Sequence, residues 1–314
     1  MAAYKKVALY ASYQTGDTLP GYVRFALLHL AQTDFHVVLL TNERPLSEES
    51  LKFIADNDIE LFLTQNHGFD FGMWHRFLQL KVQSPASNGS LGAMGSLDRL
   101  LVLNDSIVYF QDNFAKFFAE AEKRDADVVS LTQSDEIAPH LQSFFLYMKQ
   151  PALGAFFMHL FETPEQEDFE STVRLMEVGL SEKFAEAEVS MDSIYRTKDK
   201  PLFASQELIE QGAGFIKRKL LQRRFTFSEK KHFIRMGYKK LLNVDYAGII
   251  KSAGLAPDFD ETWIPAPIDS SLKHGADLVW EGAFDKVGWP LLRTAIKAKY
   301  KMLGKPLEGD EYKN

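Results

Sequence analysis

Short apolar runs alternate with longer segments of helical periodicity through the first half of the chain. Compact apolar runs bounded by turn residues predict strands, whereas apolar side chains three or four positions apart predict helices. Strands are predicted at residues 6–12, 36–41, 59–63, 99–103, 127–131 and 141–147. Helices are predicted between them at residues 20–30, 47–54, 71–80 and 112–123. Because strands and helices alternate, we predict an α/β fold with a Rossmann-type, mostly parallel sheet that is covered by helices on both faces.

The second half of the chain has a mostly helical pattern. Helices are predicted at residues 164–180, 181–188, 205–210, 214–224 and 228–242. Beyond Pro257 the pattern is less regular and rich in aromatic residues, which could pack on a partner chain. Since no repeat or clear linker divides the chain, we predict one catalytic domain over residues 1–250 and a helical or irregular extension over residues 251–314.

Composition excludes several classes of protein. The chain has no cysteine, which excludes disulfides and thiolate chemistry. The pattern of a signal peptide is missing, and so is any run of ~18 apolar residues that could span a bilayer. We therefore expect a cytoplasmic protein. A formal net charge of −7 argues against general nucleic-acid binding.

Positive charge is concentrated in one stretch of this acidic chain. Residues 217–240 are strongly basic, with Phe, Leu, Met and Tyr interleaved. Such a segment is most simply the solvated face of amphipathic helices. The alternative is a surface that contacts an anionic membrane, as a peripheral protein would, or a pyrophosphate-bearing substrate.

Polar residues follow two of the predicted strands. Asp105, between Asn104 and Ser106, ends the strand at 99–103, and the loop Asn66-His67-Gly68-Phe69-Asp70 follows the strand at 59–63. Open α/β sheets place their ligand crevice at such carboxyl ends. Asp105 could hold Mg²⁺ or Mn²⁺ or bond a ribose, although an Asp here can also simply cap a turn.

The loop at residues 66–72 has the composition of a ligand-binding turn. Gly68 and Gly72 allow a close approach of the backbone, while Asn66 and Asp70 supply polar contacts at a helix start. The alternative is an ordinary loop with an Asp cap. No GxGxxG motif follows the first strand and no GxxxxGK[ST] motif is present, which argues against an NAD-binding unit and a P-loop.

Two further groups are candidates for chemistry. His140 and Gln142 open an apolar strand and could line an acceptor-sugar pocket, although a His at a strand start is more often structural. Glu177 lies between two predicted helices and could act as a general base if partial burial raises its pKa. An exposed helix glutamate is the alternative. The histidines are scattered without the spacing of metal ligands.

Several segments together resemble the rhamnan synthesis protein F family of glycosyltransferases. They are NHGFDFGMW at 66–74, RLLVLNDS at 99–106, DVVSLTQS and HLQSFFLYM within 127–148, EVGLS at 177–181 and PLFASQELIEQGAGFIKRKLLQRR at 201–224. The resemblance covers most of residues 1–250 and implies a GT-A-like fold. It also implies transfer of a sugar, usually rhamnose from dTDP-rhamnose, to a growing surface polysaccharide such as lipopolysaccharide or to a lipid-linked acceptor.

The resemblance also implies roles for individual residues. The donor would be surrounded by Tyr10, Asn42, Asn66, Asp70 and Lys217, with Lys217 neutralising the diphosphate. Asp105 takes the place of the Asp that contacts the metal or ribose, within an acidic motif that is reduced here to Asn-Asp-Ser. Glu177 matches the position of the base in inverting relatives. Transfer with inversion needs such a base and a cationic element for the departing diphosphate, either Asp105 with Mg²⁺ or Lys217 with a neighbouring Arg.

Two other functions fit the same residues less well. One is a catalytically inactive partner that binds a nucleotide sugar or glycan for a separate transferase. The other is a hydrolase with Asp105 as nucleophile, which is disfavoured because no second Asp follows two residues later. The transferase hypothesis requires Asp70, Asp105 and Glu177 to converge on one cavity.

Overall fold

The computed structural model describes residues 4–83 and 97–222. The chain divides into two compact units, residues 1–218 with 250–261 and residues 219–249 with 262–314. Nearly all described residues belong to the first unit, and the fold reported below is the fold of that unit. The boundary predicted at residue 250 stays a prediction.

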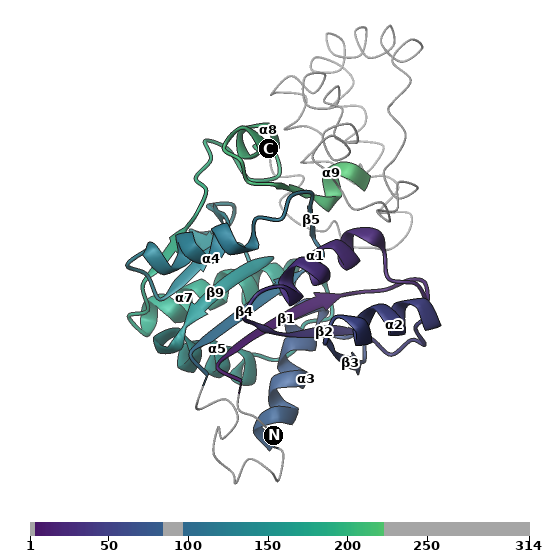
Figure 1. Ribbon diagram of the computed structural model, residues 1–314. Coiled ribbons are helices and arrows are strands. Elements are labelled where there is room, and N and C mark those ends of the chain that lie inside the picture. The colour runs from purple at the N-terminus through teal and green to yellow at the C-terminus, as the bar shows by residue number, and fades with distance from the viewer. Residues whose placement is uncertain (1–3, 84–96, 223–314) are drawn as a thin grey trace, which may run out of the picture. The chain divides into compact units, whose positions relative to one another are not determined.

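A seven-stranded sheet forms the centre of this unit, in the order β10-β6-β9-β4-β1-β2-β3 (Figure 1). All strands run parallel except β9, which pairs antiparallel with both β4 and β6. The strands are β1 (Lys6–Ser12), β2 (His36–Asn42), β3 (Glu60–Thr64), β4 (Arg99–Asn104), β6 (Val128–Ser130), β9 (Phe145–Lys149) and β10 (Met191–Ser193). The register of β1 aligns Ala11 with both Leu40 and Asn104, so β1, β2 and β4 end together at one edge.

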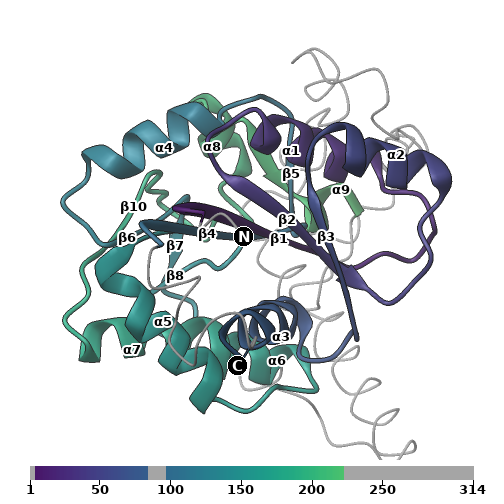
Figure 2. The same cartoon turned by 60° about the horizontal axis from the view of Figure 1, so that its bottom comes forward.

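Helices cover both faces of the sheet (Figures 1 and 2). One face carries α1 (Gly21–Ala31), α2 (Glu48–Asp56) and α4 (Phe114–Lys123). The other carries α3 (Phe69–Gln83), α5 (Gln150–Glu162), the helical run α6 (Phe169–Ser171) and η2 (Thr172–Val178), and α7 (Gly179–Glu186). Four shorter strands form two antiparallel pairs, β5 (Ile107–Tyr109) with β11 (Phe215–Lys217), and β7 (Gln133–Ser134) with β8 (His140–Leu141). The last described helices are α8 (Ser205–Glu210) and α9 (Arg218–Gln222).

Alternation along the central strands explains why both faces are covered. On β1 the side chains of Val7, Leu9 and Ala11 belong to the apolar core beneath α3 and α5, together with fully buried Trp74. Ala8 and Tyr10 point to the opposite face and are also fully buried. A strand that is apolar on both sides needs a helical layer on each side, as parallel sheets generally do.

The predicted fold class, an α/β fold with a mostly parallel sheet and helices on both faces, is confirmed. The strands predicted at 6–12, 36–41, 59–63 and 99–103 are present within one residue at each end. The strand predicted at 127–131 is shorter, and the one predicted at 141–147 is divided between β8 and β9.

Three predictions for the second half were wrong in detail. Helix α5 directly follows β9 and was not predicted. The helix expected from residue 164 begins at Phe169, because Asp168 caps it by accepting a hydrogen bond from the Ser171 N–H. Residues 215–217 form strand β11 rather than the start of a helix, because they pair with β5. The helix predicted at 228–242 and the extension after 250 lie outside the described residues.

Two helical glycines allow a matched test of packing at the start of α3. A Cβ on Gly72 would overlap the carbonyl oxygen of His67, whereas a Cβ on Gly154 in α5 would meet no atom within 4 Å. We expect Gly154→Ala to stabilise the protein by about 0.5–1 kcal/mol, the ordinary gain of Ala over Gly in a helix. Gly72→Ala should instead destabilise it by roughly 1–3 kcal/mol through overpacking. Urea denaturation of both variants measures this, and equal effects would contradict the contact at His67.

Candidate active site

A buried carboxylate at the end of β4 accepts hydrogen bonds from three separate elements. Asp105 is only 5% exposed, and its Oδ2 accepts from the hydroxyl groups of Ser12 (2.9 Å) and Tyr22 (3.3 Å). The same oxygen lies 2.5 Å from Nη1 of Arg218, which also donates to the Tyr22 hydroxyl at 2.6 Å. Because Ser12 ends β1 and Tyr22 begins α1, these contacts tie the carboxyl edge of the sheet to the start of the neighbouring helix.

Strand pairing brings Arg218 to this carboxylate from more than a hundred residues away. Strand β11 runs antiparallel to β5 with Lys217 opposite Ile107, and the N–H of Arg218 donates to the carbonyl of Ser106. Burial acts to lower the pKa of Arg218, but the charges of Asp105 and Tyr22 and the hydrogen bonds to both together raise that pKa. Arg218 is therefore a fixed positive charge at the edge of the sheet, and its side chain is 26% exposed.

A second carboxylate lies beside the first. Asp70 is in the first turn of α3, partly buried, and its Oδ2 accepts a hydrogen bond of 2.6 Å from Nδ2 of Asn104. Burial is the largest cause that raises the pKa of Asp70 to about 7, and the negative charges of Asp105 and Glu177 add to it. Arg218 and the Asn104 bond oppose the shift without cancelling it.

A third carboxylate comes from η2, on the same face of the sheet as α3. Glu177 lies in η2, a π-helical stretch whose end is marked by a bond from the N–H of Gly179 to the carbonyl of Arg174, five residues earlier. Its Oε1 accepts a hydrogen bond of 2.6 Å from the N–H of Ser143. Extra residues in a helical turn commonly redirect side chains at functional sites. Here the charge of Glu177 acts on Asp70.

The structure thus brings Asp70, Asp105 and Glu177 into one electrostatic environment, in which the guanidinium of Arg218 contacts Asp105 and opposes the raised pKa of Asp70. The sequence predicted that these three carboxylates converge. Neither the pocket beside Arg76 nor the pocket beside Phe69 is lined by any of the three. A common cavity for the donor therefore stays a prediction.

The donor set around Asp105 does not fit a divalent cation well. Its Oδ2 already faces a guanidinium and two hydroxyl groups. Within residues 4–83 and 97–222, no three His, Asp or Glu side chains are grouped as metal ligands. Hard cations prefer carboxylate oxygens to neighbours that are themselves hydrogen-bond donors or positively charged. The Mg²⁺ or Mn²⁺ cofactor stays a prediction.

The loop at residues 66–69 is held by a network around Glu165. The guanidinium of Arg76 donates to both carboxylate oxygens of Glu165 and to the carbonyls of Gln65 and His67. The rings of His67 and His75 lie 2.7 and 3.1 Å from the same carboxylate. Burial acts to raise the pKa of Glu165, but bonds from both histidines and the charge of Arg76 lower it. The network fixes the backbone that leads into Asp70.

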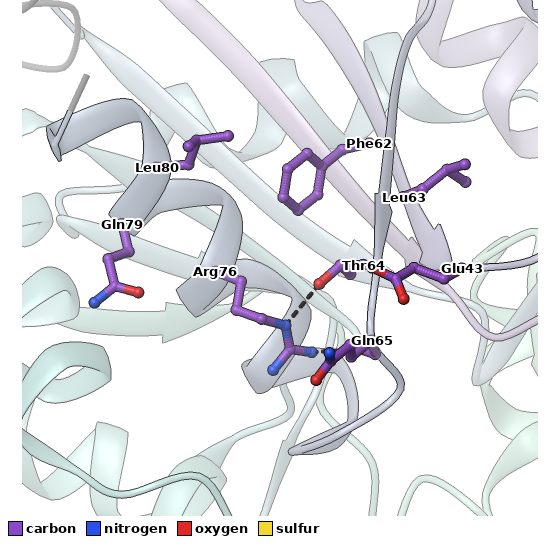
Figure 3. A pocket seen from close by; sticks show the side chains of 8 residues that line it. All are labelled: Glu43, Phe62, Leu63, Thr64, Gln65, Arg76, Gln79 and Leu80. Carbon is purple, nitrogen blue, oxygen red and sulfur yellow. Dashed lines mark hydrogen bonds between the residues drawn. The ribbon is translucent and has the colours of Figure 1, made fainter. Parts of the chain in front are cut away.

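A pocket of about 420 Å³ lies at the β3 edge of the sheet, and Arg76 forms part of its lining (Figure 3). Its lining includes Phe62 and Leu63 of β3, Glu43 after β2, and Leu80 of α3. Nε of Arg76 donates to the Thr64 hydroxyl at 2.6 Å, so the guanidinium forms the wall between this pocket and the loop.

The remaining predicted donor residues occupy varied environments. Tyr10 is fully buried on β1, where burial and the charge of Asp105 raise the pKa of its hydroxyl. Asn42 bonds both the N–H and the carbonyl of Gln14, which fixes the loop after β1. Asn66 is exposed and lines a different pocket from that at Arg76, one that also includes Phe69. Lys217 places Nζ 3.9 Å above the ring of Phe144. Their roles in donor binding stay predictions.

The two residues predicted to bind an acceptor lie in a short hairpin. His140 is buried in β8, with Nδ1 2.7 Å from the carbonyl of Ala138. Gln142 accepts a hydrogen bond from the Thr132 hydroxyl through Oε1. These contacts are structural in character, and the acceptor-binding role stays a prediction.

Sequence reasoning missed the partners that hold the carboxylates. Arg218 and Tyr22, which hold Asp105, were not singled out by residue, and neither was Glu165, which holds Arg76. A basic residue beside Lys217 was considered as a cation for the diphosphate, and the structure identifies Arg218 as the one that contacts Asp105. No sequence signal relates Glu165 to Arg76, since they meet only in the folded chain.

Comparison with known proteins gives one family match. The model of the family described as rhamnan synthesis protein F matches residues 37–247. No curated protein matches the sequence. The described helices within 4–83 and 97–222 include none with the length and hydropathy of a membrane span.

Several solved structures resemble part of the chain at low identity. A cytidylyltransferase from Leptospira borgpetersenii is 11% identical with a TM-score of 0.35, over 62% of this chain and 77% of its own. A 4-diphosphocytidyl-2C-methyl-D-erythritol synthase from Anaerococcus prevotii is 9% identical with a TM-score of 0.36, over 60% and 87%. A CMP:2-keto-3-deoxy-manno-octonic acid synthetase complexed with CTP is 10% identical with a TM-score of 0.34, over 67% and 99%. Likeness at this level identifies no shared activity.

Replacement of Arg218 should show how much the buried charge of Asp105 lowers the stability of the protein when it has no partner. We expect Arg218→Gln to lower the free energy of unfolding by roughly 3 kcal/mol, because breaking a buried pair leaves an uncompensated charge. The matched control is Lys52→Gln, which breaks an exposed i,i+4 pair with Asp56 and should cost about 0.5 kcal/mol or less. Denaturant unfolding at neutral pH measures both. Equal small effects would show that Asp105 does not depend on Arg218.

The raised pKa of Asp70 predicts a pH-dependent effect of neutralising it. Between about pH 4 and about pH 7 the folded protein keeps a proton on Asp70 that the unfolded chain loses, so this group lowers stability as pH rises through that window. The stability gained by Asp70→Asn over the unmodified protein should therefore grow from pH 4 to 7 and stay level above it. Chemical denaturation across this range checks the trend, and a constant difference would contradict the shift.

Proposed function

This chain belongs to the rhamnan synthesis protein F family, and we propose that it is a glycosyltransferase of polysaccharide synthesis. It moves a sugar from a nucleotide-sugar donor to a growing polysaccharide, with dTDP-rhamnose as donor and inversion at the anomeric carbon. The observation that carries the proposal is the gathering of Asp70, Asp105, Glu177 and Arg218 at the carboxyl edge of a mostly parallel sheet. Ligands of open α/β sheets bind at that edge.

Arg218 supplies the positive charge for the departing diphosphate. A guanidinium presents several N–H donors in one plane and binds phosphate oxygens in pairs. Asp105 and Tyr22 hold Nη1 of Arg218, so the side chain is oriented before the donor arrives. Preorganised charge of this kind lowers the barrier because it needs no rearrangement when negative charge develops on the leaving group. Lys217, the neighbouring residue, adds to the local positive charge.

Glu177 is the proposed general base. The N–H of Ser143 fixes one carboxylate oxygen at 2.6 Å, which orients the group for proton transfer. As the acceptor hydroxyl oxygen bonds to the anomeric carbon, Glu177 takes its proton. The bond between that carbon and the diphosphate oxygen breaks on the opposite face, and the electron pair leaves with the nucleoside diphosphate. One displacement of this kind inverts the configuration.

Asp70 has a different part in this arrangement. With a pKa of about 7 it is half protonated near neutral pH, and its protonated form can donate a hydrogen bond to a sugar hydroxyl or diphosphate oxygen. Protonation also keeps the edge of the sheet from carrying three negative charges at once. A diphosphate that binds nearby would favour this protonated form further.

Substitution of the two partly buried carboxylates tests the roles separately. We expect Glu177→Gln to lower turnover by about 10²–10⁴-fold while nucleotide-sugar binding is retained, because a general base typically contributes that factor. Asp70→Asn, which keeps the bond from Asn104, should lose less than Glu177→Gln. The measurement is release of dTDP from dTDP-rhamnose with a polysaccharide acceptor, combined with thermal shift by the nucleotide sugar.

Two outcomes would contradict this assignment. If Asp70→Asn abolishes turnover while Glu177→Gln does not, Asp70 is the base instead. If the unmodified protein binds nucleotide sugar but turns over none of a panel of donors and acceptors, the chain is a binding partner rather than a transferase.

A further inference from the structure

Two solvent-exposed phenylalanine rings meet where α3 and α6 begin. The rings of Phe69 and Phe169 are arranged edge to face with their centroids 6.2 Å apart. Phe69 is 39% exposed and Phe169 is 69% exposed. A single exposed aromatic residue is ordinary on a protein surface. A pair that comes from two different helices and remains open to solvent suggests a surface kept for a ligand.

The backbone at Phe69 is held in an unfavourable conformation. Its φ of 52° lies in the left-handed region, which is rare for a bulky residue and costs of the order of 1–3 kcal/mol. Arg76 compensates by binding the carbonyl of His67, and the N–H of Gly72 closes on the carbonyl of Gly68 at 2.7 Å. Such strain persists where the surroundings enforce it, and it is concentrated at binding sites.

A pocket of about 350 Å³ adjoins Phe69. Besides that ring it is lined by the side chains of Asn66, His67, Gln166 and Glu167 and by Gly68. The amides offer both donors and acceptors, the carboxylate accepts, and the imidazole can do either. Sugars present hydroxyl groups, which both donate and accept, around a ring with apolar C–H faces. Polar side chains that surround an exposed aromatic ring therefore complement a saccharide better than they complement an apolar or a strongly charged ligand.

Both rings are linked through short segments to the carboxylates of the active site. Phe69 directly precedes Asp70, whose side chain bonds Asn104. Phe169 begins the helical run, α6 followed by η2, that carries Glu177 near its end (Figure 2). Eight residues of this run span at most ~12 Å, because a π-helical turn rises less per residue than an α-helical one, and this is the scale of a short oligosaccharide. A chain that lies on the aromatic pair can therefore extend its end toward Glu177.

We propose that Phe69, Phe169 and the adjoining pocket form a subsite for the acceptor chain, which holds sugar units that precede the one being extended. This inference rests on the proposed function, because a transferase that elongates a polysaccharide holds its product at a distance from the reacting end. The subsite places the growing polysaccharide at the amino-terminal ends of α3 and α6.

Binding of a saccharide without nucleotide tests the subsite directly. The probes are an α-linked rhamnose trisaccharide and dTDP, each titrated separately and followed by calorimetry. Phe169→Ala should weaken trisaccharide binding about tenfold, the equivalent of one lost aromatic contact. Phe169→Tyr, which keeps the ring, should bind as the unmodified protein does. The matched control is Tyr4→Ala, which removes an aromatic ring that is 49% exposed at the opposite, amino-terminal end of β1.

The outcomes separate this subsite from the proposed function. Loss of trisaccharide binding in Phe169→Ala, with dTDP binding unchanged, supports the subsite. It does so even if Glu177→Gln shows that the catalytic assignment is wrong. Equal trisaccharide affinity in Phe169→Ala and Tyr4→Ala would overturn it, as would failure of the unmodified protein to bind the trisaccharide. A large fall in the melting temperature of Phe169→Ala with unchanged saccharide affinity would show that the ring serves packing instead, and would also overturn it.

Discussion

The ion pair between Asp105 and Arg218 is the interaction on which the active-site edge depends. Removing a carboxylate from water costs several kcal/mol, and Asp105 is almost completely buried. The cost is offset only because Arg218, Ser12 and Tyr22 converge on one oxygen. These partners come from β1, α1 and the segment after β11, so the pair fastens distant parts of the chain around the end of β4.

This pair also sets the charge balance of its neighbours. Arg218 compensates Asp105, which leaves Asp70 and Glu177 without an equally close cation in the described region. Burial, together with the charges of Asp105 and Glu177, raises the pKa of Asp70 to about 7. An incoming diphosphate would meet a guanidinium that is already oriented and a neighbouring carboxyl group that can stay neutral. In the proposed function, these side chains would stabilise the leaving group.

A second set of contacts fixes the loop before α3, so that Phe69 and Asp70 point to different surroundings. Arg76 and Glu165 hold the backbone of residues 65–67, and Gly72 allows the tight approach that follows. As a result Phe69 faces solvent while Asp70, the next residue, bonds inward to Asn104. One rigid turn can therefore serve two parts of a substrate, with sugar units held outside and the reacting groups inside.

Local pattern predicted most of the elements and the sheet edge at which Asp70 and Asp105 lie, whereas long-range contacts decided which groups surround them. Asp70 and Asp105 could be placed at one edge because each follows a strand that is evident from its apolar run. Arg218 could not be paired with Asp105, since residues 215–217 have a helical pattern and become a strand only by pairing with β5. Helix α5 was missed because it is apolar on nearly all sides and follows β9 without a loop. Its periodicity is therefore weak.

A crystal structure of the protein with dTDP-rhamnose, grown with Mg²⁺ present, tests the central claim most directly. The account predicts that the diphosphate oxygens lie within hydrogen-bond distance of the Arg218 guanidinium, that Asp105 remains paired with Arg218, and that the anomeric carbon faces Glu177. A metal ion that bridges Asp105 and the diphosphate with Arg218 displaced would contradict it. So would a nucleotide bound away from the carboxyl edge of the sheet.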